Sequence, residues 1–247
     1  MTRTKNQHPI PILTYHQIAE APVKGMPYRS LYVAPVDFQR QMALLHRLGY
    51  QGLSMSALQP YLSGERYGKV FGITFDDGYL NNLTNALPVL QRYGFSSTCY
   101  VVSQQLGRTN AWDREVGIPE VDLMTLDQLR LWIAGGQEVG AHTRHHVRLS
   151  TQDAMVCRDE IATCKTELEA LTGSVVGHFC YPYGEFTSEH EDMVREAGYL
   201  TATTTERSRC LTGESLTALP RVPVLRSTTL LLLWFKMVSA YEDRRRS

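Results

Sequence analysis

The sequence lacks any excess of charge of one sign. Its 247 residues include 25 lysines and arginines and 25 aspartates and glutamates, so the formal net charge is zero. Proteins that hold nucleic acid or an acidic polymer through their overall electrostatic field usually carry a basic surplus. The balance of charges therefore indicates no partner of either class, and we expect no nucleic-acid binding.

Cysteines are few and irregularly placed. There are five, an odd number without regular spacing, which argues against a framework of disulfides. Cys99 and Cys180 stand in apolar, strand-like runs, and Cys157 and Cys164 stand in a helical stretch. We expect these four side chains to behave as small buried hydrophobic groups.

Long hydrophobic runs are also missing. The most apolar stretch, residues 230–238 (LLLLWFKMV), is far shorter than the roughly 20 residues that span a bilayer. A basic tail, residues 244–246, follows it. Packing of a last helix against the body of the protein is the first interpretation, and contact with a membrane surface is the alternative. The N-terminal sequence MTRTKNQHPIPILTYHQ has no apolar run of signal-peptide length, which predicts a cytoplasmic protein.

Strand-like and helical patterns alternate along the chain, with no repeat or linker, and predict one domain over residues 1–247. Helical spacing follows Pro35 and Thr125, and a longer helix is predicted over residues 151–171, ending before Gly173. Alternation of this kind predicts an α/β fold with parallel strands, either an open sheet or a barrel. The predicted strands are residues 12–15, 70–75, 97–102, 138–141, 175–181, 200–204 and 219–224.

The most informative segment is ITFDDGYL, residues 73–80, in which an apolar strand runs into two carboxylates and a glycine. Successive side chains of a strand point to opposite faces, and Gly78 permits the chain to turn. Asp76 and Asp77 can then perform different tasks, one binding a metal and the other moving protons. An ordinary Asp-Gly turn is the alternative interpretation.

A second polar segment, VGAHTRHHVRLS, follows the predicted strand at residues 138–141. His142 and His146 stand four residues apart, a spacing that can converge on one ion. Together with Asp77 they form the two-imidazole, one-carboxylate set of a catalytic zinc or similar metal. Surface or capping histidines are the alternative, but both segments follow strands, where α/β folds place their sites.

These segments resemble the polysaccharide deacetylases of carbohydrate esterase family four, the NodB-homology domain. TFDDG at residues 74–78 matches the first motif of the family, and His142, Thr143, His146 and Leu149 match the second, H-[S/T]-x-x-H-x-x-L. The sequence YPYG at residues 181–184 resembles the third. The similarity runs from LTYH at residues 13–16 to LPR at residues 219–221. It implies a distorted, incomplete (β/α) barrel of about seven parallel strands.

The resemblance also implies an activity, the metal-dependent removal of N-acetyl groups from amino sugars in a polysaccharide or oligosaccharide. Asp77, His142 and His146 would hold one divalent ion, with zinc expected and cobalt, nickel or manganese as alternatives. Asp76 would be the general base, and the backbone N–H of Tyr183, positioned by Pro182, would stabilise the oxyanion. An O-acetyl esterase and a catalytically decayed carbohydrate-binding relative are the alternative functions.

The long connection 103–124 has no clear periodicity, and such loops are often functional. Trp112 and Asp113 within it could line a sugar groove, because an aromatic face packs on a pyranose ring. Simple burial of Trp112 is the alternative.

Two departures from the family pattern concern the catalytic acid and the partner of the base. Most members carry an L-x-H histidine near the C-terminus, but no histidine follows Leu219. His16 is the expected substitute, as in a subset with permuted motif order that includes enzymes acting on poly-N-acetylglucosamine; a buried structural histidine is the alternative. Cys180 stands where the family usually has an arginine that orients the base, and Arg221 could reach the same carboxylate.

Overall fold

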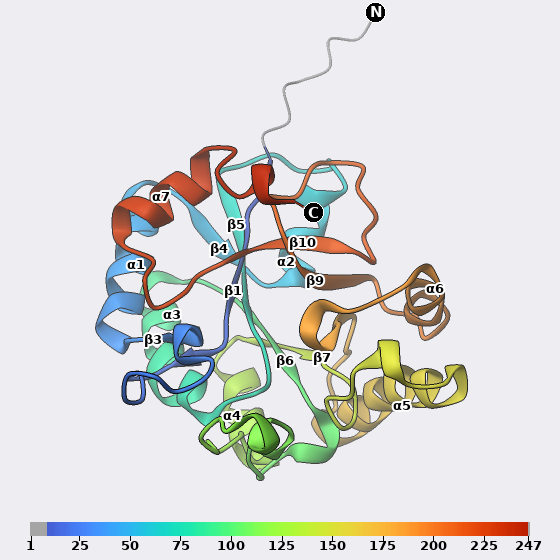
Figure 1. Ribbon diagram of the computed structural model, residues 1–247. Coiled ribbons are helices and arrows are strands. Elements are labelled where there is room, and N and C mark those ends of the chain that lie inside the picture. The colour runs from blue at the N-terminus through green and yellow to red at the C-terminus, as the bar shows by residue number, and fades with distance from the viewer. Residues whose placement is uncertain (1–8, 247) are drawn as a thin grey trace, which may run out of the picture.

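The computed structural model describes residues 9–246, and its centre is a ring of seven parallel strands with helices around it (Figure 1). Around the ring the order is β1, β10, β9, β8, β7, β6 and β5, and β5 pairs with β1 to close it. The predicted barrel of about seven parallel strands is therefore confirmed, one strand short of the common eight. The ring strands are β1 (Ile12–Tyr15), β5 (Val70–Phe75), β6 (Thr98–Val101), β7 (Glu138–Ala141), β8 (His178–Cys180), β9 (Thr201–Arg207) and β10 (Leu219–Pro223).

An eighth parallel strand, β4 (Gln51–Leu53), distorts the ring. One edge of β5 pairs with β1. The other edge is shared, because β4 pairs with residues 70–72 and β6 pairs with residues 74–75. The sequence did not predict β4 or the two-residue pair β2 (Gln17–Ile18) and β3 (Tyr32–Val33), because segments this short carry no readable periodicity.

The α-helices lie outside the barrel, with α1 and α7 side by side at one flank and α5 and α6 at the opposite one (Figure 1). Thr125 caps its helix as predicted, in a capping box with Gln128. The helix predicted over 151–171 begins later, because the Asp153 carboxylate accepts the N–H of Val156 and caps it there. The helices are α1 (Pro35–Arg47), α2 (Met55–Leu62), α3 (Leu87–Tyr93), α4 (Leu126–Ala134), α5 (Ala154–Thr172), α6 (Ser188–Glu196) and α7 (Leu230–Val238).

Short 3-10 and π segments complete the chain, and two of them order the connection 103–124. Within that connection, Asn110 is buried and its side-chain oxygen accepts the N–H of Val121 at 2.6 Å. These segments are η1 (Arg29–Leu31), η2 (Asn82–Ala86), η3 (Ser103–Gln105), η4 (Ala111–Val116), η5 (Leu149–Thr151), η6 (Pro182–Gly184) and η7 (Asp243–Arg245).

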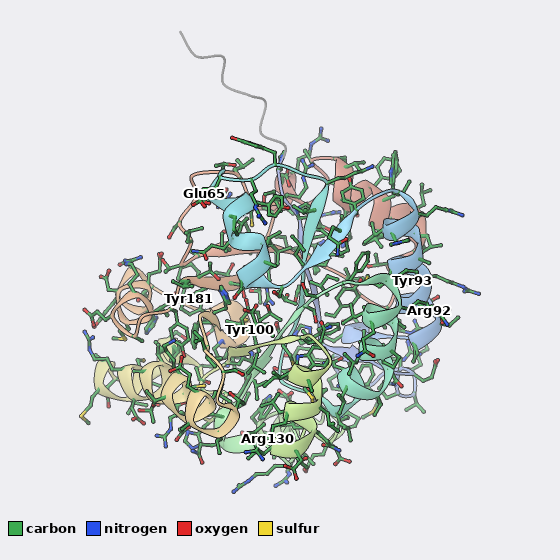
Figure 2. All side chains as sticks on the ribbon, turned by 180° about the vertical axis from the view of Figure 1, so that it is seen from behind. Glu65, Arg92, Tyr93, Tyr100, Arg130 and Tyr181 are labelled. Carbon is green, nitrogen blue, oxygen red and sulfur yellow. The ribbon has the colours of Figure 1, made fainter. Side chains whose placement is uncertain are left out.

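Burial follows the predicted pattern. Figure 2 shows Tyr100 near the middle of the barrel and Arg130 at the periphery, in agreement with a fully buried and an exposed side chain. All five cysteines are buried and unpaired, as expected from their spacing. Among residues 9–246 no helix is both long and apolar enough to cross a membrane. The first eight residues, on which the predicted localisation partly rests, lie outside the described part of the chain.

Candidate metal centre and catalytic site

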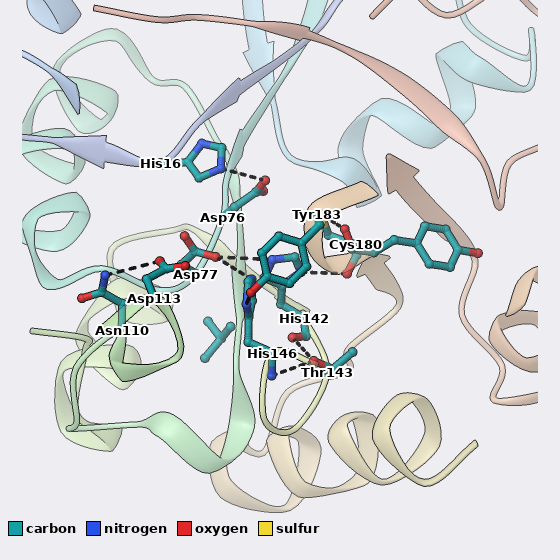
Figure 3. A network of polar contacts seen from close by, with 12 residues as sticks. His16, Asp76, Asp77, Asn110, Asp113, His142, Thr143, His146, Cys180 and Tyr183 are labelled. Atoms are coloured by element: carbon teal, nitrogen blue, oxygen red, sulfur yellow. Dashed lines mark hydrogen bonds and ion pairs between the residues drawn. The ribbon is translucent and has the colours of Figure 1, made fainter. Parts of the chain in front are cut away.

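The candidate site lies where the barrel strands end, and it draws its side chains from four of them (Figure 3). His16 follows β1, Asp76 and Asp77 follow β5, His142 follows β7, and Arg221 lies within β10. Because all strands of a parallel barrel end at the same face, residues far apart in sequence meet there.

The two adjacent aspartates point apart because the chain turns at Asp77 itself. The N–H of Asp76 still donates to the Tyr15 carbonyl at 3.0 Å, which continues the pairing of β5 with β1. Asp77 then adopts a φ of 75° and Gly78 a φ of 82°. A non-glycine residue in this region costs about 1–2 kcal/mol. The turn predicted at Gly78 therefore begins one residue earlier, at a strained position.

Asp77, His142 and His146 converge on one point. The Nε2 atoms of both histidines lie 3.4 Å from Oδ1 of Asp77, and one ligand atom from each residue lies within 4.8 Å of the others. All three side chains are buried. Nδ1 of His142 donates to the Cys180 carbonyl at 2.7 Å, so Nε2 is the ring nitrogen that faces Asp77 and that would bind a cation once it is deprotonated. The donor set fits a divalent transition metal with open coordination positions.

The loop that carries the two histidines is held in a strained conformation by its own threonine. Thr143 and His146 have positive φ angles, 61° and 59°. The Thr143 hydroxyl donates to the His142 carbonyl at 2.6 Å and accepts the N–H of His146 at 3.0 Å. These two hydrogen bonds bring both rings to the same side, facing Asp77 (Figure 3).

The charges within the three residues favour cation binding. Burial raises the pKa of Asp77, but hydrogen bonds from His142 and His146 outweigh it and hold the pKa well below its ordinary value. Burial lowers the pKa of His146, which favours the neutral imidazole that a metal requires. Burial lowers the pKa of His142 as well, but the neighbouring Cys180 and Asp77 outweigh it and hold that pKa well above its ordinary value. The Asp77 carboxylate is thus ionised and the His146 ring neutral at ordinary pH, and a bound cation would displace a proton from His142.

Asp76 is paired with Arg221, as the sequence suggested it could be. Nη1 of Arg221 donates to Oδ1 at 2.7 Å and Nη2 donates to Oδ2 at 2.8 Å, a two-pronged contact between fully buried groups. Burial raises the pKa of Asp76, but the guanidinium outweighs it and keeps the pKa below its ordinary value. Nη2 also reaches Sγ of Cys180 at 3.3 Å, so the cysteine occupies space beside the arginine.

His16 faces the same carboxylate from the other side. Its Nε2 lies 3.8 Å from Oδ2 of Asp76, and the Asn82 side chain donates to its backbone carbonyl at 3.0 Å. The His16 side chain is 24% exposed and lines the cavity described next, so it is not a fully buried structural histidine.

A cavity of about 410 Å³ opens over these residues. Trp112 and Tyr183 line it from two loops, and Tyr28 and Tyr32 line it from the segment before α1. The indole of Trp112 stacks on the His146 ring, with centroids 4.5 Å apart. Trp112 is half-buried, lines the cavity and packs against a candidate ligand, so it is not simply a buried core residue.

Tyr183 also lines the cavity and packs edge-on against the His146 ring, with centroids 4.7 Å apart. It adopts a φ of 60° directly after the buried Pro182, and its hydroxyl lies 3.2 Å from Nδ1 of His146.

Burial raises the pKa of Asp113, which also lines the cavity, to about 6, and the neighbouring Asp77 adds to that rise.

Several cavity residues were not predicted. The guanidinium of Arg148 lies 3.8 Å above the Tyr183 ring and forms an ion pair with Glu185. Arg148 lies within the second motif, directly before Leu149, so its position could have suggested it. Tyr28 and Tyr32 carry no comparable signal, because only the fold brings their segment to the cavity.

Comparison with known proteins gives the following similarities. The family model for polysaccharide deacetylases matches residues 63–202, more than half of the chain. The protein YxkH of Bacillus subtilis is 27% identical over 224 residues, which cover 90% of this chain and 74% of YxkH.

Solved structures share the fold. The deacetylase PplD of Streptococcus pyogenes, solved in complex with acetate, has a TM-score of 0.82 at 24% identity, over 94% of this chain and 99% of PplD. A polysaccharide deacetylase from Bacillus cereus has a TM-score of 0.78 at 25% identity, over 93% of this chain and 69% of that one.

Proposed function

This chain belongs to the polysaccharide deacetylase family, and on that premise we propose that it is a metal-dependent hydrolase. It would remove N-acetyl groups from amino sugars in a polysaccharide or oligosaccharide. The single observation that carries the proposal is the pair of adjacent aspartates with separate partners. Asp77 faces two imidazoles, and Asp76 is held by Arg221.

In this proposal Asp77, His142 and His146 hold one divalent cation, with zinc as the expected ion. The support is the buried N₂O donor set and the carbonyl that fixes the proton of His142 on Nδ1. A divalent cation bound there would polarise the acetyl carbonyl and lower the pKa of a nearby water molecule.

The proposal gives Asp76 the role of general base. Its carboxylate accepts a proton from the water that attacks the acetyl carbon. Arg221 supports this role because its two hydrogen bonds keep the carboxylate ionised and fix its orientation. Asp76 is thus deprotonated, and able to act as the base, at a lower pH than an unpaired buried carboxyl group would be.

The remaining steps need an oxyanion donor and an acid. We assign the first to the backbone N–H of Tyr183, whose positive φ and preceding proline fix the turn. We assign the second to His16, which would give its proton to the sugar nitrogen as the C–N bond breaks. His16 borders the cavity on the Asp76 side, where a leaving amine could be reached.

The test is acetate release from a panel of N-acetylated and O-acetylated glycans by the purified protein, before and after chelation and after readdition of zinc. We expect release from N-acetylated glycans that chelation abolishes and zinc restores. Greater release from O-acetylated glycans would favour the esterase alternative. Bound metal without release from any glycan in the panel would contradict the proposed activity.

A further inference from the structure

Helix α7 leaves one apolar face uncovered, on the flank of the barrel beside α1 (Figure 1). Leu233 and Met237 are buried, so the opposite side of the helix fixes it to the protein. Five other large apolar side chains of the helix are exposed, with fractions between 40% and 66%. We call this set the C-terminal apolar face: Leu230, Leu231, Trp234, Phe235 and Val238.

Exposed arginines flank α7 in the sequence on both sides. Arg226 precedes α7, and Arg244 and Arg245 follow it; all three are exposed, and no ion pair joins them to a carboxylate in residues 9–246. The acidic residues of the same segment face inward. Glu242 is fully buried and forms an ion pair with Lys236 at 2.6 Å, and the Asp243 carboxylate accepts from Arg209 at 2.7 Å.

The size of the face argues against a second copy of the chain as its occupant. A stable protein interface covers roughly 800 Å² per partner and 20–30 residues. The C-terminal apolar face comprises five partly covered side chains on a nine-residue helix. Leucine with tryptophan and phenylalanine on one side of a helix, with exposed arginines before and after it in the sequence, is typical of helices that lie in the plane of a membrane surface.

We propose that the C-terminal apolar face binds the surface of a membrane that contains anionic phospholipid. The apolar side chains enter the interface, and Arg226, Arg244 and Arg245 contact the headgroups. Leu225, shortly before the helix, lines the catalytic cavity, so the bound protein would hold its cavity close to the membrane. The inference concerns binding alone and does not depend on the proposed chemistry.

Sedimentation with vesicles tests this proposal. We expect the protein to bind vesicles of phosphatidylcholine mixed with phosphatidylglycerol, to bind pure phosphatidylcholine much less, and to dissociate as salt is raised, because salt screens exposed charges. Replacing Arg244 and Arg245 together by Gln should weaken binding to the mixed vesicles on the order of 30-fold. Leu231→Gln and Trp234→Gln should each weaken binding on the order of 10-fold.

Met155→Gln is the matched control, because Met155 is 78% exposed on α5, away from α7. It should leave vesicle binding unchanged. Leu231 is the most exposed member of the face, so its variant tests the proposal even if Trp234→Gln fails to fold. Absence of binding to the mixed vesicles would overturn the proposal, as would equal losses in Met155→Gln. So would a concentration-dependent dimer that Leu231→Gln abolishes, because the occupant would then be a second copy.

Discussion

The barrel carries a cluster of histidine and carboxylate side chains at each end, and only one has the features of a site. The second cluster joins residues at the starts of β6, β7, β8 and β9 to α2. His178 lies 2.9 Å from the Ser56 hydroxyl and 2.8 Å from the Thr201 hydroxyl. Glu138 accepts from Thr98 at 2.5 Å and also contacts Ser56.

The two ends differ in backbone strain and in open volume. All five non-glycine residues with positive φ in residues 9–246 lie at the end that carries Asp77: Tyr28, Asp77, Thr143, His146 and Tyr183. The cavity opens at this end, and no residue of the second cluster lines it. Residue types alone therefore do not distinguish a functional cluster from a structural one. Backbone strain beside a cavity does distinguish them. A strained residue persists only where the surrounding structure imposes its conformation, and such residues cluster at functional sites.

The largest effect should come from substituting the two adjacent aspartates. Asp77→Ala should lose both metal and activity, because it removes the only carboxylate of three ligands. Asp76→Asn should retain the metal and lose about 10²- to 10⁴-fold in turnover, because only the base is removed. Metal analysis and acetate release, measured on the same samples, distinguish loss of the metal from loss of turnover. Equal metal loss in both variants would show that the separate roles assigned to Asp77 and Asp76 are wrong.

A smaller, substrate-dependent effect is expected at His16. An amine leaving group requires a proton, whereas an activated phenolate does not. His16→Ala should therefore slow hydrolysis of an N-acetylated sugar by about 10²-fold or more and spare nitrophenyl acetate, with metal retained. Assays of both substrates on one preparation provide the internal control. Equal losses would assign His16 a structural role.

Arg221→Ala should change the pH dependence of turnover while leaving metal content nearly intact. The guanidinium lowers the pKa of Asp76, so its removal raises that pKa. Because the base acts when deprotonated, the acidic limb of the pH–rate profile should move to higher pH, and turnover at neutral pH should fall by about 10-fold. Arg221→Lys, which keeps one positive charge, should show a smaller displacement. If the acidic limb of the pH–rate profile does not move, the proposed effect of Arg221 on Asp76 is refuted.

The smallest effect on catalysis should come from the second cluster. His178→Ala should lower the free energy of unfolding by about 1–3 kcal/mol, because it leaves the Thr201 hydroxyl and Glu138 with fewer partners. Metal content and turnover at low temperature should stay as in the parent. Metal loss would make this cluster part of the site.

The same variant has a pH signature. Burial lowers the pKa of His178, so the neutral ring stabilises the fold above its ordinary pKa of 6.5. This contribution is lost as the pH falls from there through the lowered value. Thermal melts from neutral to acidic pH should therefore show a shallower decline in His178→Ala than in the parent.

The sequence by itself determined the strands that are buried on both faces and the motif residues at their ends. Ile12–Tyr15, Val70–Phe75 and Glu138–Ala141 have the predicted bounds, because strands of a parallel barrel appear as continuous apolar runs. Asp77, His142 and His146 could be named together because each follows such a run and the residue types match one ligand set. β4 could not be predicted, since three residues form a strand only by pairing with β5.

Only the tertiary structure decided which side chains meet across the barrel. Arg221 and Asp76 are 145 residues apart, and they touch because β1 pairs with both β10 and β5. The same closure brings His16 to Asp76. Local sequence does not encode this order of strands; it follows from the way the whole chain buries its apolar faces in one closed ring. For the same reason, no local pattern predicted that Glu138 and His178 would belong to one structural cluster at the opposite end.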